Sequence, residues 1–170
     1  MIINGSKLLQ LAPIANMIPS KERFEGTSHG LAEAGYDLQI NQDIHFQPYS
    51  WKEGARIGVK DHFGNSTTYV GRFCIASAKE LFQMPQNLVG VVHDKSTWAR
   101  KGLSVFNTVI EPGWNGYLTL ELVFHGNEEI IIKRGQGIAQ VLFSELVEPG
   151  DYGDGKYQNQ ENRPVNAISS

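Results

Sequence analysis

Residues 117–124 read YLTLELVF, and apolar and other side chains alternate along this stretch with a period of two. In an extended strand the four even-numbered residues, all Leu or Phe, would face one side of a sheet. Such a row of large apolar side chains must be buried, so the stretch predicts a β-strand on the core. Glu121 would lie in the middle of the opposite face, either exposed to water or turned toward a ligand.

Similar short runs of β-forming residues occur on both sides of this strand, separated by glycine, proline and asparagine. No stretch repeats at a fixed period. Many short strands at this spacing are typical of an all-β barrel, sandwich or jelly roll, and we expect one such mainly β domain over residues 1–147. The predicted strands are residues 36–40, 68–75, 88–92, 103–110, 117–124, 130–133 and 138–146.

The two ends of the chain follow other patterns. Residues 7–12 (KLLQLA) predict one short N-terminal helix, capped by Ser6 and stopped at Pro13. Residues 14–35 are irregular and polar, and we expect a mobile loop around 26–30. Residues 148–170 are rich in Gly, Pro, Asn and Gln, which fits either a disordered end or a flexible segment that orders over a ligand.

The chain has 170 residues, a formal net charge of -3 and one cysteine, Cys74. Without a basic excess, a nucleic-acid partner is not expected. One cysteine cannot form an intrachain disulfide or a zinc site with two thiolates, so we expect a reducing compartment and no catalytic zinc. No apolar run is long enough to span a membrane, and the start lacks the pattern of a signal peptide.

Polar motifs gather in residues 90–143, first in residues 93–103 (HDKSTWARKGL). Lys95 supplies a point charge, Ser96 a hydroxyl and Arg100 a forked set of N–H donors, a combination that suits a phosphate chain. The alternative is a surface turn with solvated charges, which for Lys95 alone is the more frequent case.

A second motif follows at residues 107–121 (NTVIEPGWNGYLTLE), and it includes Asn107 and Thr108. Residues 112–113 (PG) predict a tight turn. Beside that turn Glu111 can accept a hydrogen bond from a sugar hydroxyl, and Trp114 offers an apolar face to sugar or base. The alternatives are a surface position for Glu111 and packing in the core or a subunit interface for Trp114.

These two motifs and residues 135–143 (GQGIAQVLF), in this order and spacing, resemble the dCTP deaminase and dUTPase superfamily. Residues 36–38 (YDL) resemble an early strand of that superfamily. Residues 156–160 (KYQNQ) look like its C-terminal segment, which covers the nucleotide. The resemblance spans roughly residues 30–165 and implies a dUTPase-like distorted β-barrel or jelly roll with a short N-terminal helix. It also implies a homotrimer with sites between subunits, acting on pyrimidine deoxynucleoside triphosphates.

The resemblance assigns roles to residues of this chain. Glu121 falls where the deaminases carry their catalytic glutamate, which implies metal-free hydrolytic deamination of dCTP to dUTP and ammonia. Glu121 would alternate as base and acid, Ser96 would position the water, and Arg100 would hold Glu121 in place. Mg²⁺ would arrive with the triphosphate. The implied substrate-binding residues are Lys95, Asn107, Thr108, Glu111, Trp114, Gln140, Lys156, Tyr157 and Gln160.

Three departures from the deaminase pattern keep other functions open. The loop at residues 106–109 is shorter and closer to that of dUTPases, Glu111 replaces an aspartate, and Lys95 replaces an arginine. One alternative is a dUTP diphosphatase or a bifunctional enzyme that produces dUMP, with Glu111 as its essential carboxylate. Others are a modified cytosine nucleotide as substrate and a nucleotide-binding module without turnover. The lone thiol and the absent signal peptide fit a cytoplasmic bacterial or phage-encoded enzyme.

Overall fold

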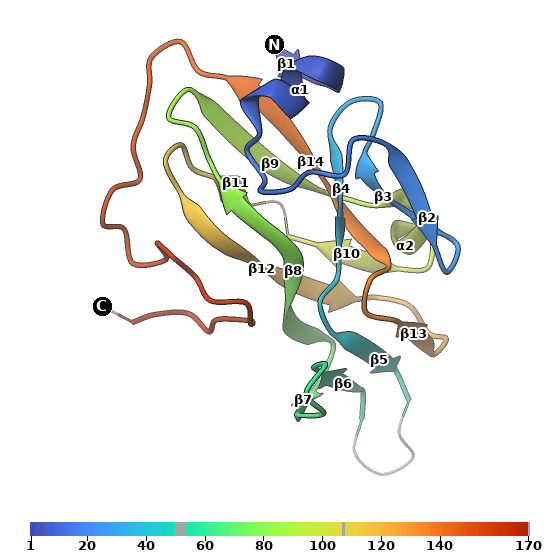
Figure 1. The fold of residues 1–170 in the computed structure, drawn as a ribbon. Helices are drawn as coiled ribbons and strands as arrows, with labels where there is room; N and C mark the ends of the chain where they lie inside the picture. Colours follow the sequence, from blue (N-terminus) through green and yellow to red (C-terminus); the bar gives the residue numbers. More distant parts are fainter. Residues whose placement is uncertain (50–53, 107, 170) are drawn as a thin grey trace.

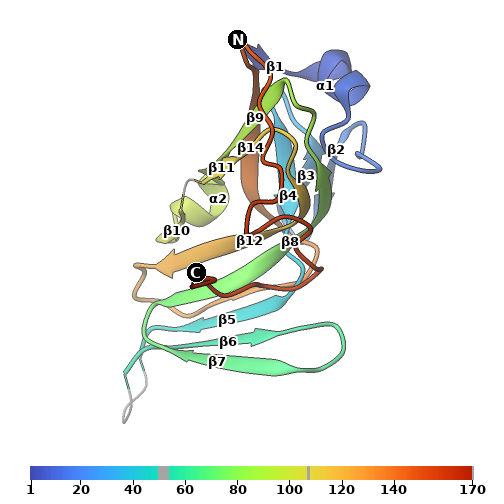
Figure 2. The same cartoon turned by 90° about the vertical axis from the view of Figure 1, so that its left-hand side faces the viewer.

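The computed structural model describes residues 1–49, 54–106 and 108–169, which form three antiparallel sheets (Figures 1 and 2). The largest sheet has the order β11-β9-β14-β4-β3-β2, with β1 paired to β14; the others are β10-β12-β8 and β13-β5-β6-β7. The strands of the largest sheet are β1 (Ile2–Ile3), β2 (Lys21–Phe24), β3 (Thr27–Leu31), β4 (Tyr36–Gln39), β9 (Leu88–Asp94), β11 (Val109–Ile110) and β14 (Gly137–Glu145). The remaining strands are β5 (Asp43–Gln47), β6 (Arg56–Lys60), β7 (Ser66–Val70), β8 (Phe73–Gln83), β10 (Leu103–Val105), β12 (Asn115–Phe124) and β13 (Ile130–Ile132).

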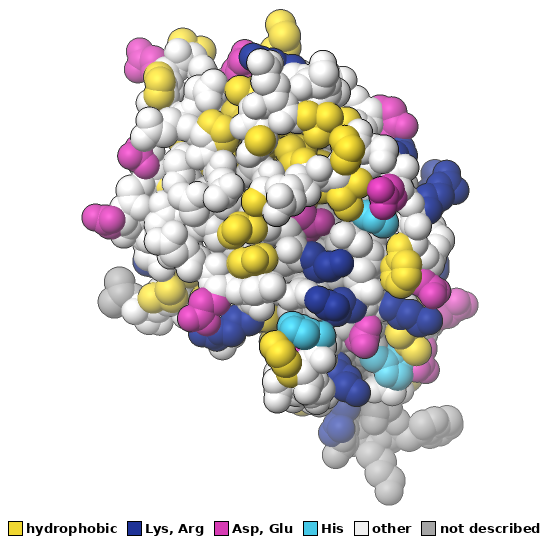
Figure 3. All heavy atoms as spheres, in the orientation of Figure 1, with side chains coloured by type: hydrophobic (Ala, Val, Ile, Leu, Met, Phe, Trp, Pro, Cys, Tyr) yellow, Lys and Arg dark blue, Asp and Glu magenta, His cyan; other side chains and the backbone are white. Residues whose placement is uncertain are grey.

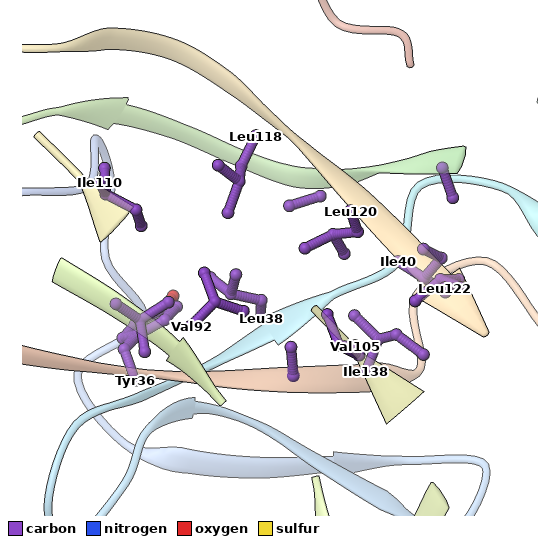
Figure 4. Close-up of a cluster of buried hydrophobic side chains, with 14 of the residues drawn as sticks. Tyr36, Leu38, Ile40, Val92, Val105, Ile110, Leu118, Leu120, Leu122 and Ile138 are labelled. Atoms are coloured by element: carbon purple, nitrogen blue, oxygen red, sulfur yellow. The ribbon is translucent and has the colours of Figure 1, made fainter. Parts of the chain in front are cut away.

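The core lies between the largest sheet and the three-stranded sheet. The alternation predicted for β12 is confirmed, because Leu118, Leu120, Leu122 and Phe124 are all buried. Figure 4 shows Leu118 and Leu120 pointing across the core toward side chains of the facing sheet. Among the described residues the sheets do not close into one barrel, so the fold is a distorted, mainly β arrangement of packed layers, as the sequence predicts.

The N-terminal helix is confirmed, but its predicted cap is wrong. Helix α1 (Gly5–Leu11) begins one residue before Ser6, follows Asn4, and has no side-chain cap. Ala12 caps its C-terminal end in a left-handed backbone conformation, and the Ala12 N–H bonds to the Leu8 oxygen at 3.0 Å. A second, four-residue helix, α2 (Ser96–Ala99), was not predicted, and it lies inside the proposed phosphate motif.

The mobile loop expected at residues 26–30 is wrong. Strands β2 and β3 form a hairpin there, and β3 also pairs with β4. Thr27 and His29 are buried in it. The Thr27 hydroxyl donates to the Phe24 oxygen at 3.1 Å and accepts from the N–H of Gly137 at 2.8 Å. These bonds satisfy the buried Thr27 hydroxyl, and buried polar residues give a strand without apolar alternation, which is why the pattern concealed it.

Two predicted strands are each divided in the structure. Residues 68–75 are not one strand, because β7 ends at Val70 and Gly71, with a φ of 102°, turns the chain into β8. Residues 103–110 contribute β10 to β12 and β11 to β9, which belong to different sheets. The other five predicted strands are confirmed to within two residues. Neither β5 nor β6 was predicted.

Residues 148–169 contain no helix or named strand, and they return across the sheets. Figure 2 shows this tail crossing in front of β12 and β8. A parallel bridge joins Gly116 on β12 to Gln160 in the tail. The structure gives the path of the segment, and its expected flexibility stays a prediction. Within the described residues, no helix is long and apolar enough to cross a membrane.

Candidate active site

A pocket of about 490 Å³ lies between the three-stranded sheet, the segment before β12 and the tail. Strands β8 and β12 form its floor, and one side is residues 108–111 with Trp114. The tail closes the other side with Tyr152, Tyr157, Gln160 and residues 165–167. The pocket therefore brings together strands that are distant in the sequence and the Gly- and Asn-rich C-terminal tail.

Glu121 is the carboxylate on the pocket floor. It lies on β12 opposite Ile75 of β8, and Phe73 lines the pocket beside it. Its Oε2 atom is buried and has no hydrogen-bond partner among the described residues. Burial raises the pKa of this carboxyl group above its usual value. A carboxyl group beside a cavity can act in turn as a base and as an acid toward a bound molecule.

Trp114 packs in the core, which is one of the two roles weighed for it, and its contact with a ligand stays a prediction. Its side chain is buried, and its ring packs against that of Phe82 with the centroids 6.0 Å apart. The indole Nε1 donates to the backbone oxygen of Tyr157 at 2.7 Å, and the residue also lines the pocket. Trp114 is therefore a core residue that forms a wall of the cavity and supports the tail.

The tight turn predicted before β12 is confirmed. The N–H of Trp114 bonds to the Glu111 oxygen at 3.2 Å, and Gly113 has a φ of 76°. The positive φ favours glycine, and a Cβ atom at this position would lie 2.5 Å from Oδ1 of Asp151, so the Asp151 side chain would have to move. Glu111 is exposed and lines the pocket together with Thr108, while Asn107 lies outside the described residues.

The tail is attached to β12 through backbone bonds. The Gln160 oxygen accepts from the N–H of Tyr117 at 3.0 Å, and the Asn159 N–H donates to the Asn115 oxygen at 2.8 Å. Of the predicted tail residues, Tyr157 and Gln160 line the pocket. Lys156 is exposed, and its Nζ donates to the Ile168 oxygen at 3.1 Å rather than lining the cavity.

Lys95 belongs to a different cluster, buried between β9, β4 and β3. Its Nζ lies 2.5 Å from Oδ2 of Asp37 and 2.9 Å from Oγ of Ser28. Gln140 donates to Oδ1 of Asp37 at 3.2 Å. The Lys95 and Asp37 side chains are only 10% and 3% exposed. Direct phosphate binding by Lys95 would require this buried ion pair to open, and neither Lys95 nor Gln140 lines the pocket.

Ser96 and Arg100 are exposed at the two ends of α2. Within one described chain neither residue lines the pocket, and Arg100 makes no hydrogen bond or ion pair with Glu121. The predicted pairing of these two residues is thus not formed inside a single subunit, and it stays a prediction for an assembly.

The pocket is acidic. Among the described residues that line it, Glu111 and Glu121 are the charged ones, and there is no Lys, Arg or His. Figure 3 likewise shows acidic side chains and few basic ones along the left-hand edge, where the tail runs.

Sequence reasoning missed several residues of this pocket. Thr119, Phe73 and Tyr152 line it, and so do residues 165–167. For Thr119 a signal was present, because it shares the face of β12 with Glu121. The others reach the site through long-range packing that one sequence does not display.

Comparison with known proteins agrees with the resemblance. A family model described as dCTP deaminase-like matches residues 9–146. A dCTP deaminase of Chlamydia muridarum (strain MoPn / Nigg) is 36% identical over 147 residues, which cover 79% of this chain and 76% of the relative.

Two solved structures share the fold at low sequence identity. A 2′-deoxycytidine 5′-triphosphate deaminase from Agrobacterium tumefaciens aligns with a TM-score of 0.53 and 15% identity over 84% of this chain and 47% of the other. A dUTPase of Staphylococcus bacteriophage 80alpha aligns with a TM-score of 0.50 and 16% identity, over 88% of this chain and 92% of that one.

Proposed function

The chain belongs to the dCTP deaminase-like family, and we propose that it hydrolyses dCTP to dUTP and ammonia. The observation that carries this proposal is the Glu121 carboxyl group, half-buried on the floor of a pocket, with one oxygen that no described residue contacts by a hydrogen bond. A surface glutamate would need no such setting. A nucleotide-binding module would gain nothing from an unpaired carboxylate, because burying it without a partner costs stability.

The proposed reaction follows from proton transfers through this one group. The Glu121 carboxylate takes a proton from a water molecule as the water oxygen attacks C4 of cytosine. It then passes this proton to N3 of the base. The second proton of that water then leaves with the amino group as the C4–N bond breaks. The products are dUTP and ammonia, and the carboxylate is restored. A pKa raised by burial suits a group that must accept and donate in turn.

We further propose that the site is completed by a neighbouring subunit in a homotrimer. A triphosphate needs cations, yet the charged residues known to line the pocket are two glutamates. Arg100 and Ser96 are exposed on α2 and free to reach a neighbour's pocket. Phe73, Phe106 and Val109 are between 45% and 53% exposed around the same strands, which suits a surface covered by another copy.

Complementation between variants tests the shared site. An Arg100→Ala chain retains Glu121, and a Glu121→Gln chain retains Arg100, so a mixed trimer would contain intact sites. We expect each variant alone to be inactive and their refolded mixture to regain measurable ammonia release. A mixture that remains as inactive as its parents, although it contains mixed trimers, would exclude this arrangement.

The remaining roles are proposed on the same basis. Mg²⁺ would enter with the triphosphate, whose oxygens it prefers as ligands. The buried Lys95–Asp37 pair would fix the start of α2, and with it Ser96, rather than contact phosphate in the conformation observed. Trp114, Tyr157 and Gln160 would contact the nucleotide, because they line the cavity.

Hydrolysis of dUTP is the second candidate, favoured by the exposed carboxylate of Glu111 at the pocket. Product analysis separates the two. The protein is incubated with Mg²⁺ and either dCTP or dUTP, and nucleotides and ammonia are quantified. We expect dCTP to give dUTP and ammonia while dUTP persists. Appearance of dUMP and pyrophosphate would show diphosphatase activity, and loss of that activity in Glu111→Gln would identify its carboxylate.

A further inference from the structure

The Thr119 hydroxyl lies where β12 meets the tail, and both of its hydrogen-bonding functions are used. It donates to Oε1 of Gln160 at 3.1 Å and accepts from the backbone N–H of Val165 at 3.0 Å. The residue is 8% exposed. One buried hydroxyl therefore bonds to both ends of the tail segment 160–165. Without this hydroxyl, β12 would hold the segment only at Gln160.

The backbone bonds between tail and β12 stop at Gln160. Before it, Asn159 and Gln160 bond to the strand backbone. After it, the next described hydrogen bond from the tail to β12 is the one from Val165 to Thr119. Residues 165–167, which follow, line the pocket. Two further bonds outside β12 hold this segment, from Nδ2 of Asn41 to Oδ1 of Asn162 at 2.7 Å and from the Ile168 N–H to the Tyr157 hydroxyl at 3.2 Å. The attachment of residues 165–167 to β12 itself is made by the Thr119 side chain rather than by continued strand pairing.

Thr119 also shares a face of β12 with Glu121, two residues away, or roughly 7 Å along a strand. Both line the same pocket. A change in how the tail sits on Thr119 would therefore alter the cavity directly above the carboxylate.

We propose that Thr119 is a positioning residue that holds the tail over the pocket, and that it acts on nucleotide binding rather than on the chemical step. This inference rests on the proposed deaminase function for its substrate. The hydroxyl is the necessary part: a valine has the same shape but offers neither a donor nor an acceptor, and it would release residues 161–167 from β12.

Three variants test the proposal. Thr119→Val removes the hydroxyl and keeps the shape, Thr119→Ser keeps the hydroxyl, and Thr67→Val makes the same change on an exposed position of β7. Steady-state kinetics with dCTP are measured for each. Loss of two hydrogen bonds from the closed form predicts a KM about tenfold higher or more for Thr119→Val. We expect its kcat to change by less than about twofold, because no reacting atom loses a contact. Thr119→Ser and Thr67→Val should resemble the parent.

Amide hydrogen exchange without nucleotide provides a readout independent of turnover. In Thr119→Val the Val165 amide should exchange faster, while amides in the β12–β8 pairing stay protected. Unchanged exchange at Val165 would overturn the proposal, and so would a fall in kcat at constant KM. If the parent protein releases no ammonia from dCTP, the deaminase function fails. Exchange at Val165 and calorimetric dCTP binding by parent and Thr119→Val then still decide the role of Thr119.

Discussion

Two carboxylates of this chain, Glu121 and Asp37, lie on neighbouring sheets in opposite settings. Asp37 is almost fully buried and is held by Lys95, Ser28 and Gln140. Glu121 is half-buried beside a cavity, and one of its oxygens has no partner among the described residues. The Asp37 carboxylate is paired with Lys95 and does not border the pocket. We therefore assign this pair a structural role. The unpartnered Glu121 carboxyl group can exchange protons with a bound molecule, which suits the role we propose for it.

Glu121→Gln should produce the largest effect of any change in this comparison. The amide keeps the size of the side chain but cannot take a proton from water, and loss of general acid–base catalysis predicts a fall in kcat of about 100- to 10,000-fold. Binding of dCTP should remain, since the pocket keeps its shape. Ammonia release and calorimetric dCTP binding measure the two effects. Glu128→Gln, on an exposed loop residue, is the matched control. Turnover near the parental rate in Glu121→Gln would remove this residue from the mechanism.

For Lys95→Met we expect the opposite pattern, in which the main effect is a loss of stability. It leaves the Asp37 carboxylate buried without its cation, and breaking a buried pair in this way costs about 3–5 kcal/mol. Urea unfolding measures the change. Lys21→Met breaks an exposed pair with Glu33 and should cost far less, because water and salt screen that pair. Replacing both partners, with Lys95→Met and Asp37→Leu together, should recover much of the loss. Equal costs for Lys95→Met and Lys21→Met would contradict a structural role for the buried pair.

The sequence predicts the setting of Glu121 better than that of the Lys95–Asp37 pair. Glu121 could be predicted because the apolar alternation of its own strand fixes which way it faces. Lys95 could not be placed correctly, because its partner Asp37 comes 58 positions earlier in the chain. The sequence groups Lys95 with Ser96 and Arg100 by adjacency. The fold instead turns the Lys95 side chain into the interior and leaves Ser96 and Arg100 outside.

The same distinction holds for the fold. Strands with one apolar face, such as β12, are visible from local pattern. The hairpin β2–β3 is not, because Thr27 and His29 are buried polar residues, and the Thr27 hydroxyl bonds to Gly137, far along the chain. The path of the tail depends on individual hydrogen bonds, such as the one from Trp114 to Tyr157. Such bonds leave no periodic pattern in the sequence.

Glu80 is a third carboxyl group to compare. For it we predict how the stability of the protein changes with pH. It accepts bonds from the N–H of Gln39, and burial raises its pKa from 4.5 to about 7. The native state therefore keeps a proton that the unfolded chain releases above pH 4.5. Native stability should fall as pH rises through this window to about 7 and then level off. In Glu80→Gln the fall should be smaller, as measured by urea unfolding at several pH values. Identical pH dependence in both proteins would refute the shift.

The pH dependence of turnover should report Glu121 itself. The carboxylate form is needed to take a proton from water, so kcat/KM should decline as pH falls through the pKa of this group. Because burial raises that pKa, the acidic limb should lie above the 4.5 of an ordinary glutamate. Stopped assays of dUTP formation across the acidic range locate the limb. A limb at or below 4.5 would mean that the assembled site, for example through Arg100, stabilises the carboxylate more than burial destabilises it.

Glu111→Gln should have the smallest effect, and it completes the comparison of carboxylates. Glu111 lines the same pocket as Glu121, but it is exposed and lies beside the turn before β12 rather than on the pocket floor. In its proposed sugar-binding role it would contribute one hydrogen bond, which an amide oxygen can also accept. We therefore expect deamination to fall by less than about tenfold. The variant and its parent are compared for ammonia release from dCTP at saturating and at low substrate. A loss as large as that in Glu121→Gln would show that exposure does not separate the two carboxylates and that the reaction requires both.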